Sequence, residues 1–580
     1  MTITSLLDGE HLGARPDSRS RSPGTPVSPR GDQPIPPSVI AAASAESMKG
    51  ISDAPRLVDR EREEAVKSLD RYYDLVKVQI LQHQSYVTGL YPRLSNDKTV
   101  GHVRDSIYCA MCCWALSRGY NRLDDDRGRT CELAQSAVKT MRGILLCWMR
   151  QCDRLEAFKH SPTPANALHS KFHLISSDEV QSYHDHNHHQ LDVVALFILT
   201  LVQFIASGLE IIFTEAEVNF VQNLVFYIER AYRIPDFGMW EMGTRYNNGA
   251  CELHASSIGM VKAALEAVNG FNLFGARGTA GSVVYVDIDA HNRNRITFET
   301  LLPRESNSKN TDAALIPVLT FPCFGTHNTF MIKRTFDKCL KKLQGKCGLK
   351  RFLRDGYGTA IFDNNRRFYN QGETKLFDGI ECQWPIFFVY LMIDAVFRGD
   401  AKQTDHYRTL VEEQLISTPH GYVLPMYYFV PEDTILRERA EPGSQRMYPD
   451  IGEYDDEPVF LWGQAMYLLG CMLADKLIFL TEVDPIHRNL PANQRPRSSN
   501  RYAGNTSDPV VQVALIAQST RLQAMLSTYG IQTQTPHQVE PIQIWSSGDM
   551  VKVLENLGKN SSLGLSGRPT RPLGTLSTSK

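Results

Sequence analysis

The chain has 580 residues, of which 42% are hydrophobic and 22% are charged, and its formal net charge is −2. This length allows two or more domains, or one large domain with extensions. The lack of a basic excess argues against nucleic acid as a partner. The chain does not open with a charged segment followed by an apolar core, so we expect no signal peptide, a cytoplasmic location and 12 reduced cysteines.

Residues 1–55 are rich in Ser, Pro, Arg and Gly. Such a composition cannot bury enough apolar surface to offset the entropy lost on ordering, so we expect a disordered tail. Several serines in it stand among arginines, where phosphorylation would reverse the local charge. The candidate phosphorylation sites are Ser18, Ser20, Ser22 and Ser28. A solvated tail without a regulatory role is the alternative.

A strong helical pattern follows from about residue 58. Val66, Leu69, Tyr73, Val76 and Ile80 recur at spacings of three and four, which places them on one face of a helix. Further apolar helices are expected at residues 107–116, 134–149, 193–212, 218–232, 258–268, 386–397 and 461–473. Many helices with long connections favour a mainly α fold, a helical toroid over residues 56–488, rather than a bundle with short loops.

Two further patterns complete the expected toroid. Residues 193–209 are uncharged and near the lower limit of membrane-spanning length, but Asp192 and Glu210 flank them and polar residues interrupt them. We therefore interpret this stretch as a helix buried on all sides. Strands are expected at residues 282–288 and 421–428, which are rich in Val, Ile and Tyr.

The composition changes near residue 489. Residues 489–509 are rich in Pro, Ser, Arg and Asn and are interpreted as a linker. Residues 510–517 then predict a strand and residues 518–529 a helix. We interpret residues 510–580 as a partial C-terminal α/β domain, too short to complete a core of its own.

An aromatic platform joins a carboxylate at Trp240 and Glu241, just after a helix and Pro235. A tryptophan ring packs on the apolar face of a pyranose, and a neighbouring acid can protonate the leaving oxygen of a glycosidic bond. A helix pattern starts at Ser256 and Ser257 and stops at residues 269–270. The pair therefore predicts a sugar pocket, although one such pair is a weak signal.

Two charged segments suggest binding but have simpler explanations. Residues 183–189 contain four His, which could bind a metal, but they lack Cys and a helical spacing, so we favour an exposed loop and expect no metal site. Residues 331–354 contain nine Lys or Arg against one acid, Asp337. Such basic amphipathic segments can bind calmodulin, although most are the wet face of a packed helix. The candidate calmodulin contacts are Phe336, Leu340, Lys341 and Lys342.

Several long strings in the chain are distinctive. They are residues 235–275, DIDAHNRNR at 287–295, LLPRESNSKNTDAAL at 301–315, FDGIECQWPIFF at 377–388, FLWGQ at 460–464 and residues 529–545. With them the chain resembles the regulatory subunits of phosphorylase b kinase, most of all the β subunit, over about residues 65–580. The resemblance implies an (α/α)6 glucoamylase-like toroid, followed by the start of a small α/β unit.

The glucoamylase-like part of the resemblance implies a glucan pocket. Its candidate substrate-binding residues are Arg104, Asp105, Trp240, Glu241, Arg351 and Asp355. The Arg–Asp pairs match positions that hold sugar hydroxyls, because guanidinium and carboxylate groups bind vicinal hydroxyls with paired hydrogen bonds. Glu241 matches the general acid. Asp105 alone would otherwise be interpreted as a helix cap.

The second carboxylate that hydrolysis needs is harder to place. An inverting enzyme uses a general base to activate water across the sugar ring. Glu441, Glu453 and Glu457 lie in the expected region, but none is in a recognisable base motif, and Met242 follows Glu241 where glucoamylases commonly carry a second acid. Glu241 is therefore interpreted as a vestigial acid. An active glucosidase, a sugar-binding remnant and a purely structural pocket stay open.

The resemblance implies a non-catalytic regulatory subunit of phosphorylase kinase, the kinase that activates glycogen phosphorylase in glycogen breakdown. The expected partners are a kinase catalytic subunit, an α-type regulatory subunit and calmodulin, with a glucan as ligand and no cofactor. The sequence has no Gly-rich loop of a kinase. The family's subunits are about twice as long and prenylated at a C-terminus absent here, so we expect no direct membrane anchor in this chain and membrane association only in longer forms.

Overall fold

The computed structural model describes residues 54–123, 128–180, 188–275, 278, 280–363, 365–366, 368–450, 458–495, 515–536, 538 and 547–569. The chain divides into two compact units, Met1–Glu61 and Arg62–Lys580. Of the first unit only the start of helix α2 (Ala54–Gln79) is described. The four candidate phosphorylation sites, and Glu453 and Glu457, lie outside the described residues.

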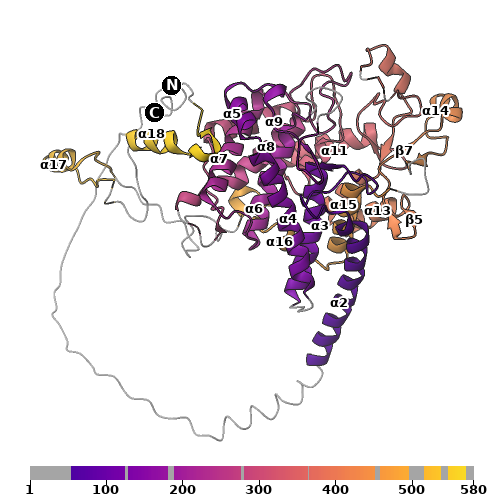
Figure 1. Ribbon diagram of the computed structural model, residues 1–580, viewed down its shortest axis with the longest axis horizontal. Coiled ribbons are helices and arrows are strands. Elements are labelled where there is room, and N and C mark those ends of the chain that lie inside the picture. Colours follow the sequence, from indigo (N-terminus) through magenta and orange to yellow (C-terminus); the bar gives the residue numbers. More distant parts are fainter. Residues whose placement is uncertain are drawn as a thin grey trace, which may run out of the picture. The chain divides into compact units, whose positions relative to one another are not determined.

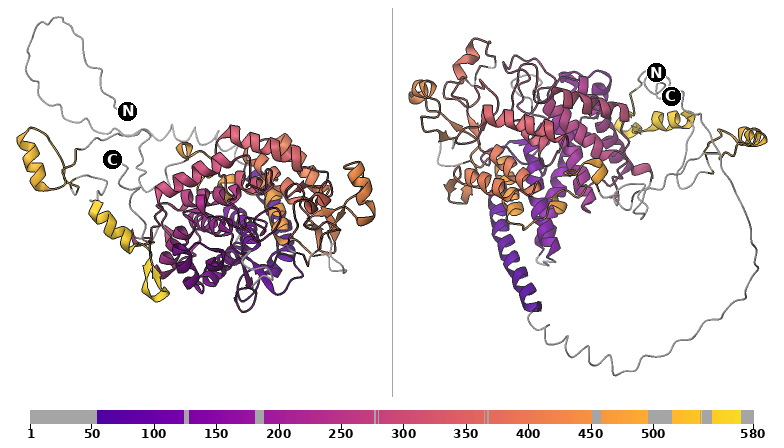
Figure 2. Two further views of the ribbon diagram at one scale, coloured as in Figure 1. Left: turned by 90° about the horizontal axis from the view of Figure 1, so that it is seen from above. Right: turned by 180° about the vertical axis from the view of Figure 1, so that it is seen from behind.

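A closed ring of helices forms the inside of the second unit. Within the described residues it consists of α3 (Val103–Arg122), α6 (Leu191–Ala206), α8 (Ala255–Val268), α10 (Leu315–Leu319), α12 (Ile386–Phe397) and α15 (Leu461–Ala474). Each helix contacts the next, and α15 returns to contact α3 (Figures 1 and 2). These helices are apolar on nearly all sides because both faces of the ring wall are covered, as in α6, where residues 191–205 are all buried.

A second layer of helices covers the ring. The outer helices are α4 (Arg129–Met149), α7 (Glu215–Ile228), α9 (Ile288–Leu301), α11 (Thr329–Leu343) and α13 (Ala401–Glu412), each packed on the inner helix that precedes it. α2 takes the same place beside α15, where Gln464 donates a hydrogen bond to Gln79 at 2.7 Å and Tyr72 donates one to Asp475 at 2.6 Å. Six helix pairs make the predicted (α/α)6 toroid.

Short antiparallel sheets line the connections that lead into the inner helices. β1 (Val100–His102) pairs with β2 (Lys171–His173) in the register Val100↔His173. A four-stranded sheet has the order β3-β4-β7-β8. Its strands are β3 (Leu349–Lys350), β4 (Gln383–Trp384), β7 (Tyr428–Phe429) and β8 (Tyr448–Pro449), and a separate hairpin joins β5 (Ile416–Thr418) to β6 (Gly421–Val423).

The predicted strand at residues 282–288 is wrong. Of these residues only Val283 forms a bridge, with Asn272, and α9 begins at Ile288. The side chain of Asp287 accepts the N–H groups of Asp289 and Ala290 and so caps the helix. The string is rich in β-branched residues, but this cap and packing on α8 decide its structure.

The remaining elements lie at the edge of the toroid or near the end of the chain. They are α5 (Cys152–His160), α14 (Ile435–Ala440), α16 (Leu480–Val483), α17 (Thr520–Thr528), α18 (Ser547–Asn556), β9 (Lys559–Asn560) and β10 (Leu565–Ser566). The helix expected at residues 518–529 is present as α17, whereas the described part of the expected strand makes one parallel bridge, Ile516↔Gln534. None of the described helices is long and apolar enough to cross a membrane.

The hairpin of β9 and β10 is anchored on α5 and α7. The buried ammonium of Lys159 donates to the carbonyl of Gly567 at 2.7 Å and to Asn223 at 2.6 Å, and Asn223 donates to the carbonyl of Gly558 at 2.7 Å. The end of the described chain is therefore tied to the outer layer of the toroid. A separate C-terminal domain beginning at residue 510 stays a prediction.

Candidate functional site

The predicted sugar-pocket residues gather where the inner helices begin. Arg104 and Asp105 lie in the first turn of α3, and Glu241 lies in the loop between α7 and α8. Arg351 follows β3. Both Arg–Asp pairs are buried, while Trp240 and Glu241 are half-buried. The residues predicted from the sequence to form a sugar pocket thus lie in one cluster.

Glu241 is held between two cations. Its Oε1 accepts a hydrogen bond from Arg93 at 3.1 Å, and its Oε2 is paired with the ammonium of Lys171. Burial alone would raise the pKa of Glu241, but the charges of Lys171 and Arg93 lower it far below its ordinary value. The carboxyl is therefore ionised at neutral pH, whereas a general acid must carry a proton to donate.

Arg104 already uses its donors within the protein. Its guanidinium binds Asp192 at 2.6 Å, Gln190 at 3.0 Å and the carbonyl of Met239 at 3.1 Å. These bonds attach α3 to the start of α6 and to the loop that carries Glu241. Asp105 differs, because its buried Oδ1 has no hydrogen-bond partner among the described residues, and burial raises its pKa. Asp105 is thus an acid of this cluster with bonding capacity left for a ligand, as is Asp192, whose Oδ1 also has no hydrogen-bond partner among the described residues.

An aromatic cluster surrounds Arg351. The guanidinium lies 5.0 Å from the ring centre of Trp240, 4.4 Å from that of Tyr357 and 5.5 Å from that of Trp384. Two hydrogen bonds to Asp355, at 2.5 and 2.9 Å, fix its orientation. One face of Trp240 is therefore covered by a cation from the same chain. A sugar ring stacking on that face would have to displace Arg351.

The chain matches glycosyl hydrolases family 15 over residues 66–570. It belongs to this family. Over 521 residues it is 50% identical to the "Probable phosphorylase b kinase regulatory subunit beta" of Drosophila melanogaster, covering 89% of this chain and 46% of the relative. Over 525 residues it is 40% identical to the skeletal muscle α regulatory subunit of phosphorylase b kinase of Oryctolagus cuniculus, covering 90% and 41%.

The predicted resemblance to phosphorylase b kinase regulatory subunits, and to β more than α, is thus confirmed. The family 15 chain spans less than half the length of these relatives. A solved glycosidase structure, titled as wild type, covers 71% of this chain and 98% of its own, with 18% identity and a TM-score of 0.47.

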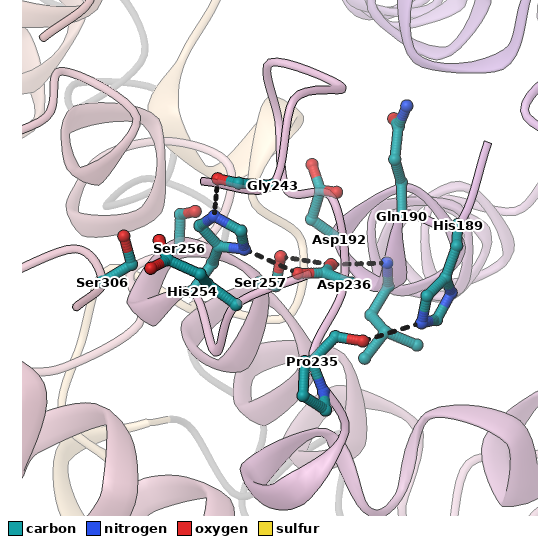
Figure 3. Close-up of polar contacts among 12 residues, drawn as sticks. His189, Gln190, Asp192, Pro235, Asp236, Gly243, His254, Ser256, Ser257 and Ser306 are labelled. Atoms are coloured by element: carbon teal, nitrogen blue, oxygen red, sulfur yellow. Dashed lines mark hydrogen bonds and ion pairs between the residues drawn. The ribbon is translucent and has the colours of Figure 1, made fainter. Parts of the chain in front are cut away.

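In this family 15 chain, a buried polar network positions the loop that carries Trp240 and Glu241 (Figure 3). His254 and Asp236 share a hydrogen bond of 2.8 Å, and Ser257 donates to the other oxygen of Asp236 at 2.7 Å. Burial would raise the pKa of Asp236, but the hydrogen bond with His254 lowers it. Gly238, at a φ of 67°, lies so close to His254 that a Cβ there would be 2.9 Å from the ring.

The network also explains a string that could mislead. Asp236, Phe237 and Gly238 spell the metal-binding triplet of protein kinases. Here Asp236 is buried and its two oxygens accept hydrogen bonds from α8 and from the N–H of Leu191. This carboxylate joins two inner helices and has a positioning role.

The sequence interpretation missed the partners of the predicted residues. Arg93 and Lys171 are 148 and 70 residues from Glu241 in the chain, and Asp312, which accepts the indole N–H of Trp240 at 2.9 Å, is 72 residues from it. His254 is the N-cap residue of α8, which begins at Ala255, one residue before the predicted start at Ser256. No spacing rule links positions this far apart, although Asp312 and Asp236 both lie in the distinctive strings.

The expectation that the His tract is an exposed loop is wrong at its end. His189 is fully buried and its Nε2 lies 3.0 Å from the carbonyl of Pro235, while His188 stacks on His169 with ring centres 3.9 Å apart. The ring of His189 therefore contacts the segment that leads into Asp236. The rest of the tract lies outside the described residues.

Neither metal nor thiolate chemistry is indicated by the described side chains. No group of three His, Cys, Asp or Glu within the described ranges is arranged to hold a metal ion. Cys109, Cys112 and Cys113 are buried in α3, and burial raises the pKa of Cys113 to about 11. These thiols are protonated core side chains at neutral pH.

The candidate calmodulin segment is the outer helix α11. Thr335, Cys339 and Leu343 are buried, and Phe336 and Leu340 are half-buried against the core. The last turn carries Lys341 and Lys342, where positive charge stabilises the helix dipole. Contact with calmodulin through Phe336 and Leu340 would require α11 to leave the toroid.

Proposed function

We propose that this chain is a non-catalytic regulatory subunit of phosphorylase kinase, and that it controls the kinase that activates glycogen phosphorylase. The support from relatives is an identity of 50% over 89% of the chain to a subunit of that name. The support from the site is the position of Glu241 between Arg93 and Lys171. This single arrangement carries the non-catalytic part of the proposal.

The protonation state of Glu241 does not suit a general acid. A glycosidase raises the pKa of its general acid so that the carboxyl keeps a proton near neutral pH. Two cations next to Glu241 act in the opposite direction, because each stabilises the ionised form. Hydrolysis would also need a base, and Glu441, the one expected candidate within the described residues, is exposed.

In this proposal the toroid is a scaffold for other subunits. Its partners are a kinase catalytic subunit, an α-type regulatory subunit and calmodulin. The names of the relatives, β and α regulatory subunits of phosphorylase b kinase, support the first two, and the resemblance alone implies calmodulin. Because this chain matches less than half of each relative, contacts that the rest of a relative makes are outside the proposal.

Affinity capture tests the scaffold. The tagged full chain is recovered from an extract of its own cells, and bound proteins are identified by mass spectrometry. We expect a kinase catalytic subunit and an α-type subunit to be recovered in fixed ratio, in an assembly that co-elutes on gel filtration. If the chain elutes alone and the purified chain releases glucose from maltooligosaccharides, the hydrolase interpretation takes its place.

Glucan binding without hydrolysis is a second function of the same pocket. It is favoured by the unpaired Oδ1 of Asp105 and by the partly exposed ring of Trp240. We expect weak, saturable binding of maltoheptaose by calorimetry, reduced by Asp105→Asn because the carboxylate would lose an acceptor. Equal affinity of the variant and the parent chain would remove Asp105 from the pocket, and no binding by either would leave a purely structural cluster.

A further inference from the structure

A cavity lined by none of the sugar-pocket residues lies elsewhere in the toroid. It has a volume of about 510 Å³ and lies between the second half of α8, most of α9 and the segments around residues 326–328 and 491–492. Lys262, His291, Asn292, Arg295 and His327 are among its lining residues. Three of them belong to the distinctive string at residues 287–295, which the proposed function does not use.

Positive charge is concentrated behind this cavity. One carboxylate, that of Glu266, is shared by Lys262 at 2.6 Å, Arg488 at 2.9 Å and Arg495 at 2.8 Å. Three cations on one anion leave a positive excess. Arg488 is fully buried, and its Nε has no hydrogen-bond partner among the described residues. Such an arrangement is costly unless further negative charge compensates it.

Opposing charges reduce this excess but do not cancel it. Glu299 lines the cavity and accepts a hydrogen bond from Thr326 at 2.9 Å. Asp484 accepts the backbone N–H groups of Arg488 and Asn489, and burial raises its pKa. Arg295 adds a further positive charge at the exposed rim, and within the described residues its guanidinium forms no hydrogen bond or ion pair.

The titration of the lining groups agrees with a positive potential. Burial is the main cause that lowers the pKa of His291 to about 4; the charge of Glu266 opposes this shift, and the charges of Lys262, Arg295 and Arg488 add to it. The pKa of His327 is lowered by burial and by Arg488 and Arg495. Both imidazoles are therefore neutral at pH 7. Nδ1 of His291 has no hydrogen-bond partner in the described structure.

We propose that this cavity binds a small phosphate-bearing molecule. The ammonium of Lys262, the rim guanidinium of Arg295 and the imidazole of His291, whose Nδ1 is unpartnered in the described structure, provide the donors that phosphate oxygens require. The cavity falls within the usual range of about 300–1,000 Å³ for small-molecule sites and exceeds the volume of a phosphate group. Asn269, Asn292 and Asn328 line the remaining space, and their amides suit hydroxyl groups. This inference does not rest on the proposed function.

Calorimetry on the purified full chain tests the site. The probes are inorganic phosphate, a hexose 6-phosphate and the neutral hexose, each at constant ionic strength. We expect the hexose phosphate to bind saturably and the neutral hexose not to bind. Inorganic phosphate binding as tightly as the hexose phosphate would identify free phosphate as the source of the ligand. Equal binding of the neutral hexose, or no binding of either phosphate probe, would overturn the proposal.

Matched variants on one helix locate the binding. Arg295→Gln removes the free rim cation, and we expect affinity to fall about tenfold, as for the loss of one charged hydrogen bond. Arg293→Gln is the control, because Arg293 is also on α9 but pairs with Asp289 at 2.9 Å and does not line the cavity. Glu299→Gln should tighten binding, since it removes the facing carboxylate. Equal effects of the two arginine variants would show non-specific charge attraction and contradict the site.

Discussion

At the scale of single residues, the neighbours of each acidic side chain determine its protonation state. Glu241 has two cations, Asp105 has an unsatisfied oxygen, and Glu305 is buried near Asp312. Glu241 also adopts a φ of 59°, a left-handed conformation that is uncommon outside glycine and typical of functional or strongly constrained positions. The pKa of Glu241 is thus lowered, whereas those of Asp105 and Glu305 are raised.

Glu241→Gln should lower the free energy of unfolding by about 1–3 kcal/mol at pH 7, because Arg93 and Lys171 lose a half-buried anion. The folded-state pKa of Glu241 is depressed, so its contribution is present above the pKa of the unfolded chain and is lost as the pH falls below it. The difference from the parent chain, measured by urea unfolding, should therefore shrink towards low pH. Glu441→Gln, at an exposed position, is the control and should change little. Equal stability of Glu241→Gln and the parent chain at pH 7 would contradict the ion pairs.

The contribution of Glu305 to stability depends on pH in the opposite direction. Burial and the charge of Asp312 raise the pKa of Glu305 from 4.5 to about 7, so its stabilisation is present below pH 4.5 and is lost as the pH rises through about 7. Glu305→Gln should remove a fall in melting temperature between about pH 5 and pH 8. Thermal unfolding across that range measures it, with exposed Glu432→Gln as control. A fall that persists unchanged in Glu305→Gln would refute the assignment.

At the scale of elements, α11 shows how a charged helix can be structural. Its buried residues recur every four positions, and Lys338 donates to the carbonyl of Asn310 at 2.7 Å. The basic residues that suggest a calmodulin target are therefore also typical of the solvent-exposed face of a packed helix. Calmodulin binding requires α11 to detach from the toroid, whereas a structural role requires it to stay packed.

We expect an isolated peptide of residues 329–343 to bind calcium-loaded calmodulin at least about tenfold more tightly than the intact chain does through this segment, because the packed helix must first be released. Fluorescence titration gives the affinities, and hydrogen exchange of α11 in the intact chain with and without calmodulin gives the location. Loss of protection in α11, together with weaker binding by Phe336→Ala, would instead support the contact predicted from the sequence.

At the scale of the whole molecule, the toroid is a ring closed by its most distant parts. Tyr108 of α3 stacks on Trp462 of α15 with ring centres 5.2 Å apart, and Gln464 bonds to Gln79 across 385 residues. The inner helices α3 and α12 each lack a neighbour until α15, the last one, is in place.

Shortening the chain on either side of α15 tests this closure. A chain ending at residue 495 keeps all six inner helices and should unfold cooperatively, with a lower melting temperature because Lys159 loses its carbonyl partner from Gly567. A chain ending at residue 458 lacks α15 and should show no cooperative transition by calorimetry, because the faces of α3 and α12 are exposed. Cooperative unfolding of the shorter chain would contradict the ring as the folding unit.

The sequence predicted the toroid because inner helices such as α12 are continuous apolar runs of helical length. It failed at α9, where only Ala290, Asn294 and Phe298 are buried and no stripe is visible. It could not show α10 either, because this inner helix is a single short turn of Leu315–Leu319.

The sequence predicted which residues form the candidate site, but not their protonation states or accessibility. Trp240 and Glu241 could be predicted because they are adjacent in the sequence, so their combination of aromatic ring and carboxylate is recognisable there. Their protonation and accessibility depend on Arg93, Lys171 and Arg351, which the fold brings from other elements. A pKa is a property of surroundings, so no local pattern could have provided it.

The closure of α15 onto α3 also has a consequence for synthesis. A ribosome that adds about 5–20 residues each second needs tens of seconds between releasing Gln79 and releasing Gln464, which lie 385 residues apart. During that time the apolar side of α3 that will receive α15 has no partner from its own chain. The nascent toroid therefore exposes an apolar surface on α3 for most of its translation. Its yield in cells should depend on chaperones that cover this surface until α15 has been synthesised.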